Sequence, residues 1–166
     1  MMSIPALLLR AASDPGLERP LAMAAPLAAL TLQLRSLALL AARLYVAQVF
    51  FLSGLTKIRD WSTTLLLFED EYRVPLLSPQ LAAWLGTGGE LLLPVLLALG
   101  LGGRLAALGL SVVNIVAVLS LAEIAPAALL GHQLWGALLL MVVLSGAGRW
   151  SLDALVNRRF SPSAGR

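Results

Sequence analysis

Ionisable side chains interrupt otherwise apolar stretches of this sequence at five positions: Arg43, Lys57, Glu90, Glu123 and His132. Holding such a group in hydrocarbon costs about 2.5–3.5 kcal/mol on insertion scales, so each one needs a partner, a cavity or access to the lipid headgroups. Ionisable residues inside membrane spans commonly bind a ligand or carry protons. These five positions are therefore the candidate site residues, and none of them is assigned a catalytic role.

Helical spacing relates three of these residues. Arg43 and Lys57 are fourteen residues apart, which brings them within about 40° of the same helix face but separates them by about 21 Å along the axis. Glu90 is the deepest carboxylate, about 13 Å along its helix from the outer end of the span. We expect Glu90 to face the first apolar helix and to pair with Lys57, whose long side chain reaches inward.

Several interpretations of these charges are open. The Lys57–Glu90 pair can serve only to lock the helices together, or Lys57 can extend toward the headgroups and leave Glu90 protonated. Alternatively, the two residues form part of a ligand or proton site. Arg43 has no acidic partner at its depth, so we expect it to bind backbone carbonyls, lipid phosphate or the head of a bound molecule.

Glu123 and His132 flank a short connection that contains Pro126. A carboxylate beside an imidazole would form a proton or ion site near the outer surface. The simpler interpretation is that both side chains are solvated or cap the turn. The chain has one histidine and no cysteine, and zinc or copper normally takes three or four ligands, so we expect no metal site.

The elements that must position these residues are apolar helices. The chain is 59% hydrophobic and 13% charged, whereas soluble domains carry about 25% charged residues. A stretch of about 20 apolar residues is long enough to cross the hydrocarbon core of a membrane. Four such spans are predicted, over residues 36–57, 81–101, 104–124 and 132–147.

A shorter helix is predicted between the first two spans. Trp61, Leu65, Phe68 and Tyr72 recur there at helical spacing beside acidic residues, a pattern typical of a helix lying on the membrane surface. The predicted fold class is therefore all-α. It is an integral membrane four-helix antiparallel bundle with short loops and an interfacial helix at its outer face.

The same pattern predicts three segments and one orientation. Residues 1–35 form an N-terminal cytoplasmic or interfacial segment, residues 36–152 the transmembrane domain, and residues 153–166 a basic cytoplasmic tail. Basic residues concentrate before the first span, in the second connection and after the fourth span, and cytoplasmic loops retain Lys and Arg, so both termini are expected in the cytoplasm. No Lys/Arg cluster exceeds the pair Arg158-Arg159, and nucleic acid is not an expected partner.

Three segments of the chain resemble the DoxX family of small bacterial membrane proteins. They read RLYVAQVFFLSGLTKIRDW, GGELLLPVLLALGLGGRLAAL and SGAGRWSLDAL, and together they extend over residues 42–155. The resemblance implies a four-helix membrane bundle whose relatives are membrane components of oxidoreductase assemblies, and related DoxD-type subunits belong to thiosulfate:quinone oxidoreductase. Arg43, Lys57 and Glu90 match recurrent polar positions of that family.

Two hypotheses about function follow. In the first, the chain is a multi-pass protein of the bacterial inner membrane, a subunit of a redox or stress-response assembly that binds a quinone or another small ligand in an intrabundle pocket around Arg43, Lys57 and Glu90. In the second, it is a scaffold or a component of a small-solute or metal transporter without redox work. Both need the lipid bilayer as a partner, with a redox-enzyme subunit or a second copy of the chain as protein partners. The residues require no cofactor, and a stand-alone enzyme is not expected.

Overall fold

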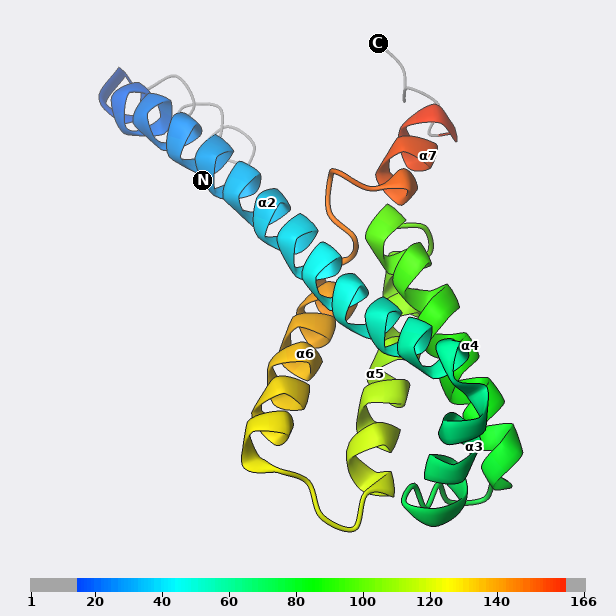
Figure 1. Cartoon of the computed structure of the whole chain (residues 1–166). Helices are drawn as coiled ribbons and strands as arrows, with labels where there is room; N and C mark the ends of the chain where they lie inside the picture. The colour runs from blue at the N-terminus through cyan, green and yellow to red at the C-terminus, as the bar shows by residue number, and fades with distance from the viewer. Residues whose placement is uncertain (1–14, 161–166) are drawn as a thin grey trace, which may run out of the picture. The chain divides into compact units, whose positions relative to one another are not determined.

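The computed structural model describes the backbone of residues 15–160 and the side chains of residues 26–160. These residues form helices joined by short connections, with no strand in the described part (Figure 1). The helices are α2 (Pro15–Arg59), α3 (Trp61–Asp70), α4 (Pro79–Leu99), α5 (Gly103–Ser120), α6 (Pro126–Ser145) and α7 (Leu152–Phe160). The predicted all-α fold is confirmed. Residues 1–14 and 161–166, the ends of the two predicted terminal segments, lie outside the described residues.

The chain divides into two compact units, residues 1–36 and residues 37–166. Within the first unit, leucines at positions 27, 30, 32 and 34 are exposed on α2. The prediction placed the first span at residues 36–57, whereas α2 is helical from Pro15 onward. Its N-terminal half is rich in Ala and Leu, which have high helix propensity, and this favours helix despite the prolines within it.

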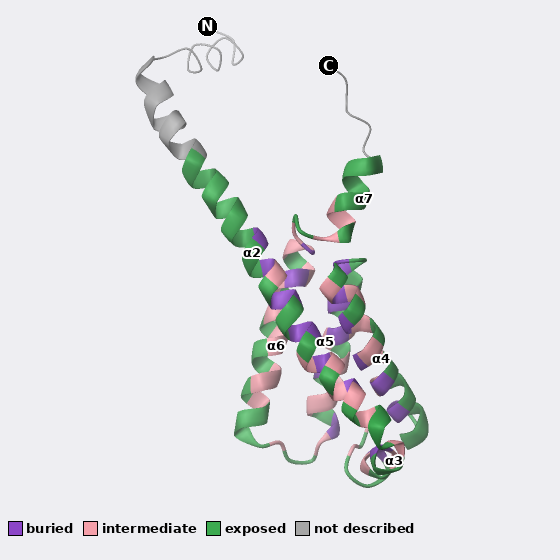
Figure 2. Ribbon diagram, turned by 45° about the horizontal axis from the view of Figure 1, so that its top comes forward, coloured by how far each residue is buried: buried purple, intermediate pink, exposed green. Residues whose placement is uncertain are grey.

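The second unit contains the core and every residue of the candidate site. Its buried residues, purple in Figure 2, lie along α2, α4, α5 and α6 and form one main cluster. The main cluster consists of Leu39, Val46, Ala47, Phe50, Leu97, Ala106, Ala107, Leu110, Leu139 and Val142. Alanines at three of these positions let the helices approach closely, as is usual in membrane bundles.

Four helices are long and apolar enough to cross a membrane: Pro26–Arg59, Pro79–Leu99, Gly103–Ser120 and Pro126–Ser145. Their outer faces carry large exposed leucines, such as Leu105 at 74% and Leu144 at 71% exposure. A soluble monomer rarely exposes apolar patches of that extent. The exposed faces therefore contact lipid, which confirms the predicted multi-pass membrane protein.

Capping residues set the helix ends and explain where the predicted boundaries were displaced. Ser78 caps α4 and accepts a hydrogen bond from the Leu81 amide, while Pro79 occupies its first turn. Pro126 likewise starts α6, six residues before the predicted fourth span, because proline suits the first helical turn. Gly146 ends α6 with a φ of 79°, which glycine adopts without steric cost.

Candidate functional site

Lys57 of α2 and Glu90 of α4 form the predicted ion pair. The Lys57 Nζ atom lies 2.5 Å from Glu90 Oε2 and 3.1 Å from the hydroxyl oxygen of Ser53, one helical turn earlier. Glu90 is only 7% exposed. Gly54 makes this contact possible, because a Cβ atom there would lie 2.9 Å from the Leu91 side chain and hold the two helices apart.

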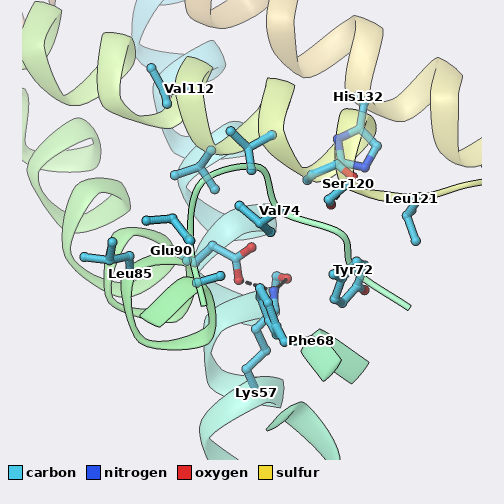
Figure 3. Close-up of a pocket in the computed structure, with 17 residues that line it drawn as sticks. Lys57, Phe68, Tyr72, Val74, Leu85, Glu90, Val112, Ser120, Leu121 and His132 are labelled. Atoms are coloured by element: carbon cyan, nitrogen blue, oxygen red, sulfur yellow. Dashed lines mark hydrogen bonds and ion pairs between the residues drawn. The ribbon is translucent and has the colours of Figure 1, made fainter. Parts of the chain in front are cut away.

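A cavity of about 360 Å³ opens beside this pair. Most of its wall is apolar and comes from α3, α4 and α5, and Figure 3 shows Phe68, Leu85 and Val112 there. Polar groups reach it from α2, α4, α5, α6 and the segment that follows α3. They are Ser53, Lys57, Tyr72, Glu90, Ser120 and His132.

Tyr72 enters the cavity from the segment between α3 and α4 (Figure 3). Its ring packs against Phe68 with centroids 5.0 Å apart, and the amide of Arg73 donates a hydrogen bond to the Ser120 carbonyl at 2.8 Å. Burial raises the pKa of Tyr72, and the Glu71 and Glu90 carboxylates raise this pKa further. The phenol therefore stays protonated and can donate a hydrogen bond to a ligand.

His132 of α6 reaches the same cavity and is held by Asn114 of α5. Its Nδ1 lies 2.8 Å from Asn114 Oδ1, and Asn114 Nδ2 donates to the His132 carbonyl at 2.9 Å. Glu123 is exposed, and no hydrogen bond or ion pair joins it to His132 in residues 26–160. Of the two interpretations given for these residues, the direct contact between carboxylate and imidazole is not formed, because the buried amide of Asn114 binds the imidazole nitrogen instead.

Arg43 does not line the cavity, and this corrects the expectation of one pocket around three charges. Its side chain is 1% exposed. The guanidinium donates hydrogen bonds to the carbonyls of Ala147, of Trp150 at 2.9 Å and of Ala98 at 3.3 Å. Carbonyl binding was one of the three expected roles. Since Arg43 precedes Lys57 by almost four helical turns, it lies toward the opposite end of the bundle.

Asp153 supports this second polar cluster. Its carboxylate accepts hydrogen bonds from the amides of Gly102 at 2.8 Å and Gly103 at 3.0 Å, at the N-terminus of α5. Its own amide donates to the Gly100 carbonyl at 3.0 Å. An anion is stabilised at a helix N-terminus by the unpaired amides and the helix dipole. Arg43 and Asp153 thus tie α2, the α4–α5 turn and the segment before α7 together as a structural clasp.

Sequence reasoning found the ion pair but did not place Tyr72 at the cavity. Tyr72 was assigned to the surface helix, and only its helical register with Phe68 links it to the cavity in the sequence. Asn114 of α5 makes an interhelical hydrogen bond with His132 of α6, and nothing in the sequence marks the two residues as partners. Within residues 26–160 no group of three or more His, Cys, Asp or Glu side chains is placed to hold a metal ion.

The cavity combines an apolar wall with a few oriented donors and acceptors, which is the usual constitution of a site for a small organic ligand. The DoxX family model matches residues 38–123, just over half of the chain. The matched stretch contains Arg43, Lys57 and Glu90 and ends before His132. No curated protein and no solved structure matches this chain significantly.

Proposed function

The chain belongs to the DoxX family, and we propose that it is a ligand-binding membrane subunit of a redox or stress-response assembly whose cavity takes the head of a quinone-type molecule. The observation that carries this proposal is the buried Lys57–Glu90 pair at the edge of an apolar cavity. A pair that served only to lock two helices would need no cavity beside it.

The chemistry of the cavity fits a flat ring with oxygen atoms at its ends. The Lys57 ammonium has three N–H donors, and Ser53 and Glu90 use two of them. The third, together with the Tyr72 hydroxyl, can donate to a ligand oxygen. The valine, leucine and phenylalanine wall suits the ring itself. A volume of about 360 Å³ lies near the lower end of ligand pockets, about 300–1,000 Å³, which favours a head group over a whole isoprenoid quinone.

The proposal places the protein in the bacterial inner membrane with both termini in the cytoplasm. Basic residues concentrate near the α7 end of the spans, and acidic residues near the α3 end. In this orientation the cavity, which residues of α3 and the segment after it help to line, lies in the outer half of the bundle. The natural chain has no cysteine, so single cysteines report orientation without background.

Orientation is tested with Glu123→Cys and Arg149→Cys, two exposed positions at opposite ends of the spans. We expect a membrane-impermeant maleimide added to whole cells to label position 123, and to label position 149 only after permeabilisation. The reverse pattern would overturn the orientation.

Ligand binding is tested on the purified full chain in nanodiscs, with ubiquinone-1 as the probe and quenching of tryptophan fluorescence as the readout. Glu90→Gln and Lys57→Met should each weaken binding by about tenfold, which corresponds to about 1.4 kcal/mol. The matched control is Glu123→Gln, the same chemical change at an exposed carboxylate outside the cavity, and it should bind as the unmodified protein does.

Two results would count against the proposal. Equal affinity in all four proteins would show that the probe binds elsewhere. If a water-soluble reagent labelled cysteines placed on both sides of Glu90 and no quinone bound, the second hypothesis of a small-solute transporter component would be favoured.

A further inference from the structure

The mutual hydrogen bonds of Asn114 and His132 determine which nitrogen of the imidazole carries the proton. The His132 carbonyl oxygen can only accept, so the amide nitrogen of Asn114 must face it, as the 2.9 Å contact has it. The amide oxygen of Asn114 then faces His132 Nδ1 at 2.8 Å. Because an amide oxygen also only accepts, Nδ1 must be the donor. In the neutral ring, Nε2 is therefore an unprotonated acceptor.

Local packing keeps the ring in this position. Trp135 meets the imidazole edge-on with centroids 4.9 Å apart. Gly136 lies beside Asn114, where a Cβ atom would be 3.4 Å from Asn114 Nδ2. Asn114 is itself 5% exposed, so water does not compete for its two hydrogen bonds.

The remaining nitrogen has no partner within the described part of the chain. His132 lines the cavity (Figure 3), and no hydrogen bond to its Nε2 atom is formed by residues 26–160. The ionisable groups that face the same cavity are Lys57 of α2, Glu90 of α4 and Tyr72 of the segment after α3. Lys57 and Glu90 already neutralise each other, so a bare acceptor remains on the α6 side.

We propose that His132 determines ligand specificity: its Nε2 atom selects a ligand that brings a hydroxyl donor, such as the phenolic hydroxyl of a hydroquinone, over the same ring with a carbonyl or ether oxygen. This inference rests on the proposed function and names the oxidation state that the cavity prefers. A carbonyl oxygen placed against Nε2 would be repelled, because both atoms are acceptors with lone pairs. A hydroxyl can instead donate a hydrogen bond to Nε2. A ligand that displaces water from Nε2 without donating to it loses a hydrogen bond and binds more weakly.

The first test compares two redox-inert probes, a para-alkylphenol and its methyl ether, which differ only in the donor hydrogen. Affinities are measured on the full chain in nanodiscs at pH 8, where an ordinary imidazole is neutral. We expect the phenol to bind about tenfold more tightly than the ether. His132→Phe should bring this ratio close to one by weakening only phenol binding. The matched control, Gln133→Leu, changes an exposed neighbour outside the cavity and should keep the ratio.

The second test needs no variant, because His132 is the single histidine of the chain. Protein labelled with ¹⁵N-histidine and purified without a histidine tag gives ring signals from this residue alone. We expect a protonated Nδ1 and an unprotonated Nε2, and a shift of the Nε2 signal when the phenol is added but not when the ether is added.

The outcomes separate this inference from the proposed function. Equal binding of phenol and ether, or a proton found on Nε2 in the neutral ring, would overturn the role of His132 while leaving quinone binding intact. Failure of the phenol, the ether and ubiquinone-1 alike to bind would overturn both.

Discussion

Arg43 of α2 donates a hydrogen bond to the carbonyl of Ala147, a residue 104 positions later in the chain, at the end of α6. The guanidinium is buried and meets backbone oxygens, with the Asp153 carboxylate near enough to act on it through its charge. The planar guanidinium carries several N–H donors and can bind several carbonyl oxygens at once. A lysine ammonium, which is a single compact charge, cannot bind the same set of carbonyls. This relationship gives Arg43 a structural role, and the proposed ligand cavity lies toward the other end of the bundle.

Replacement of Arg43 should therefore lower stability and leave ligand affinity unchanged. Arg43→Met removes the donors of three carbonyls, and each unsatisfied buried group costs about 1–3 kcal/mol. We expect a clearly lower midpoint of thermal unfolding, followed by tryptophan fluorescence in detergent, and a smaller loss for Arg43→Lys. Arg149→Lys, an exposed arginine near the same end, is the control. Ubiquinone-1 binding that fell in folded Arg43→Lys would contradict the assignment.

Gly100 should tolerate substitution less well than Gly102, although both have positive φ angles of 66° and 57°. Alanine at either position incurs the left-handed backbone cost of about 1–2 kcal/mol. At Gly100 the new Cβ atom would also lie 2.5 Å from Arg43 Nη1 and from Ser151 Cβ, whereas nothing lies within 4 Å at Gly102. We expect Gly100→Ala to unfold at a lower temperature than Gly102→Ala. Equal midpoints of thermal unfolding for the two variants would show that the contact of Arg43 with residue 100 does not limit substitution there.

The Lys57–Glu90 pair should show strong energetic coupling in a double-mutant cycle. Removing one partner leaves the other charge unpaired in a site of low polarity. We expect this to lower the free energy of unfolding by roughly 3 kcal/mol, the lower end of the range for buried pairs. Lys57→Met combined with Glu90→Gln should be more stable than the sum of the two single losses predicts. Reversible unfolding in mixed micelles measures the four free energies. Strict additivity would mean that the 2.5 Å contact contributes no specific interaction.

Asp60 should titrate below the ordinary range of an aspartate. The Thr63 amide donates to Asp60 Oδ1 at 3.0 Å, and this bond is the largest cause of a lowered pKa, followed by the hydroxyls of Thr63 and Ser62. The carboxylate therefore stabilises the start of α3 fully above the unfolded pKa of about 3.9, and this stabilisation is lost as the pH falls through the folded pKa. The ¹³C signal of the Asp60 carboxyl, assigned with Asp60→Asn, measures this midpoint.

Thr63→Ala provides the matched comparison for Asp60, because it removes the threonine hydroxyl but keeps the backbone amide. The pKa of Asp60 should then rise only part of the way toward its ordinary value. A midpoint at the ordinary value in the unmodified protein would refute the cap.

The membrane fold and the central ion pair were both predictable from the amino-acid sequence. Apolar runs of about 20 residues indicate spans, since hydrocarbon excludes unpaired polar groups whatever the tertiary arrangement. Lys57 and Glu90 could be paired because both are isolated charges and the long side chain of Lys57, at the outer end of its span, can reach inward to the deeper Glu90. Helix ends were predicted less well, as α6 begins at Pro126, six residues before the predicted start of the fourth span.

Only the tertiary structure determined which groups form hydrogen bonds with Arg43 and His132. Arg43 is satisfied mainly by backbone carbonyls, which every residue carries, so no side chain in the sequence marks its partners. His132 is held by Asn114 of a neighbouring helix. Glu123 is nearer to His132 in the sequence, but it forms no hydrogen bond with His132 among the described residues. The solvation cost of a charge is a local property that a sequence records, whereas the choice among acceptors depends on how the helices pack.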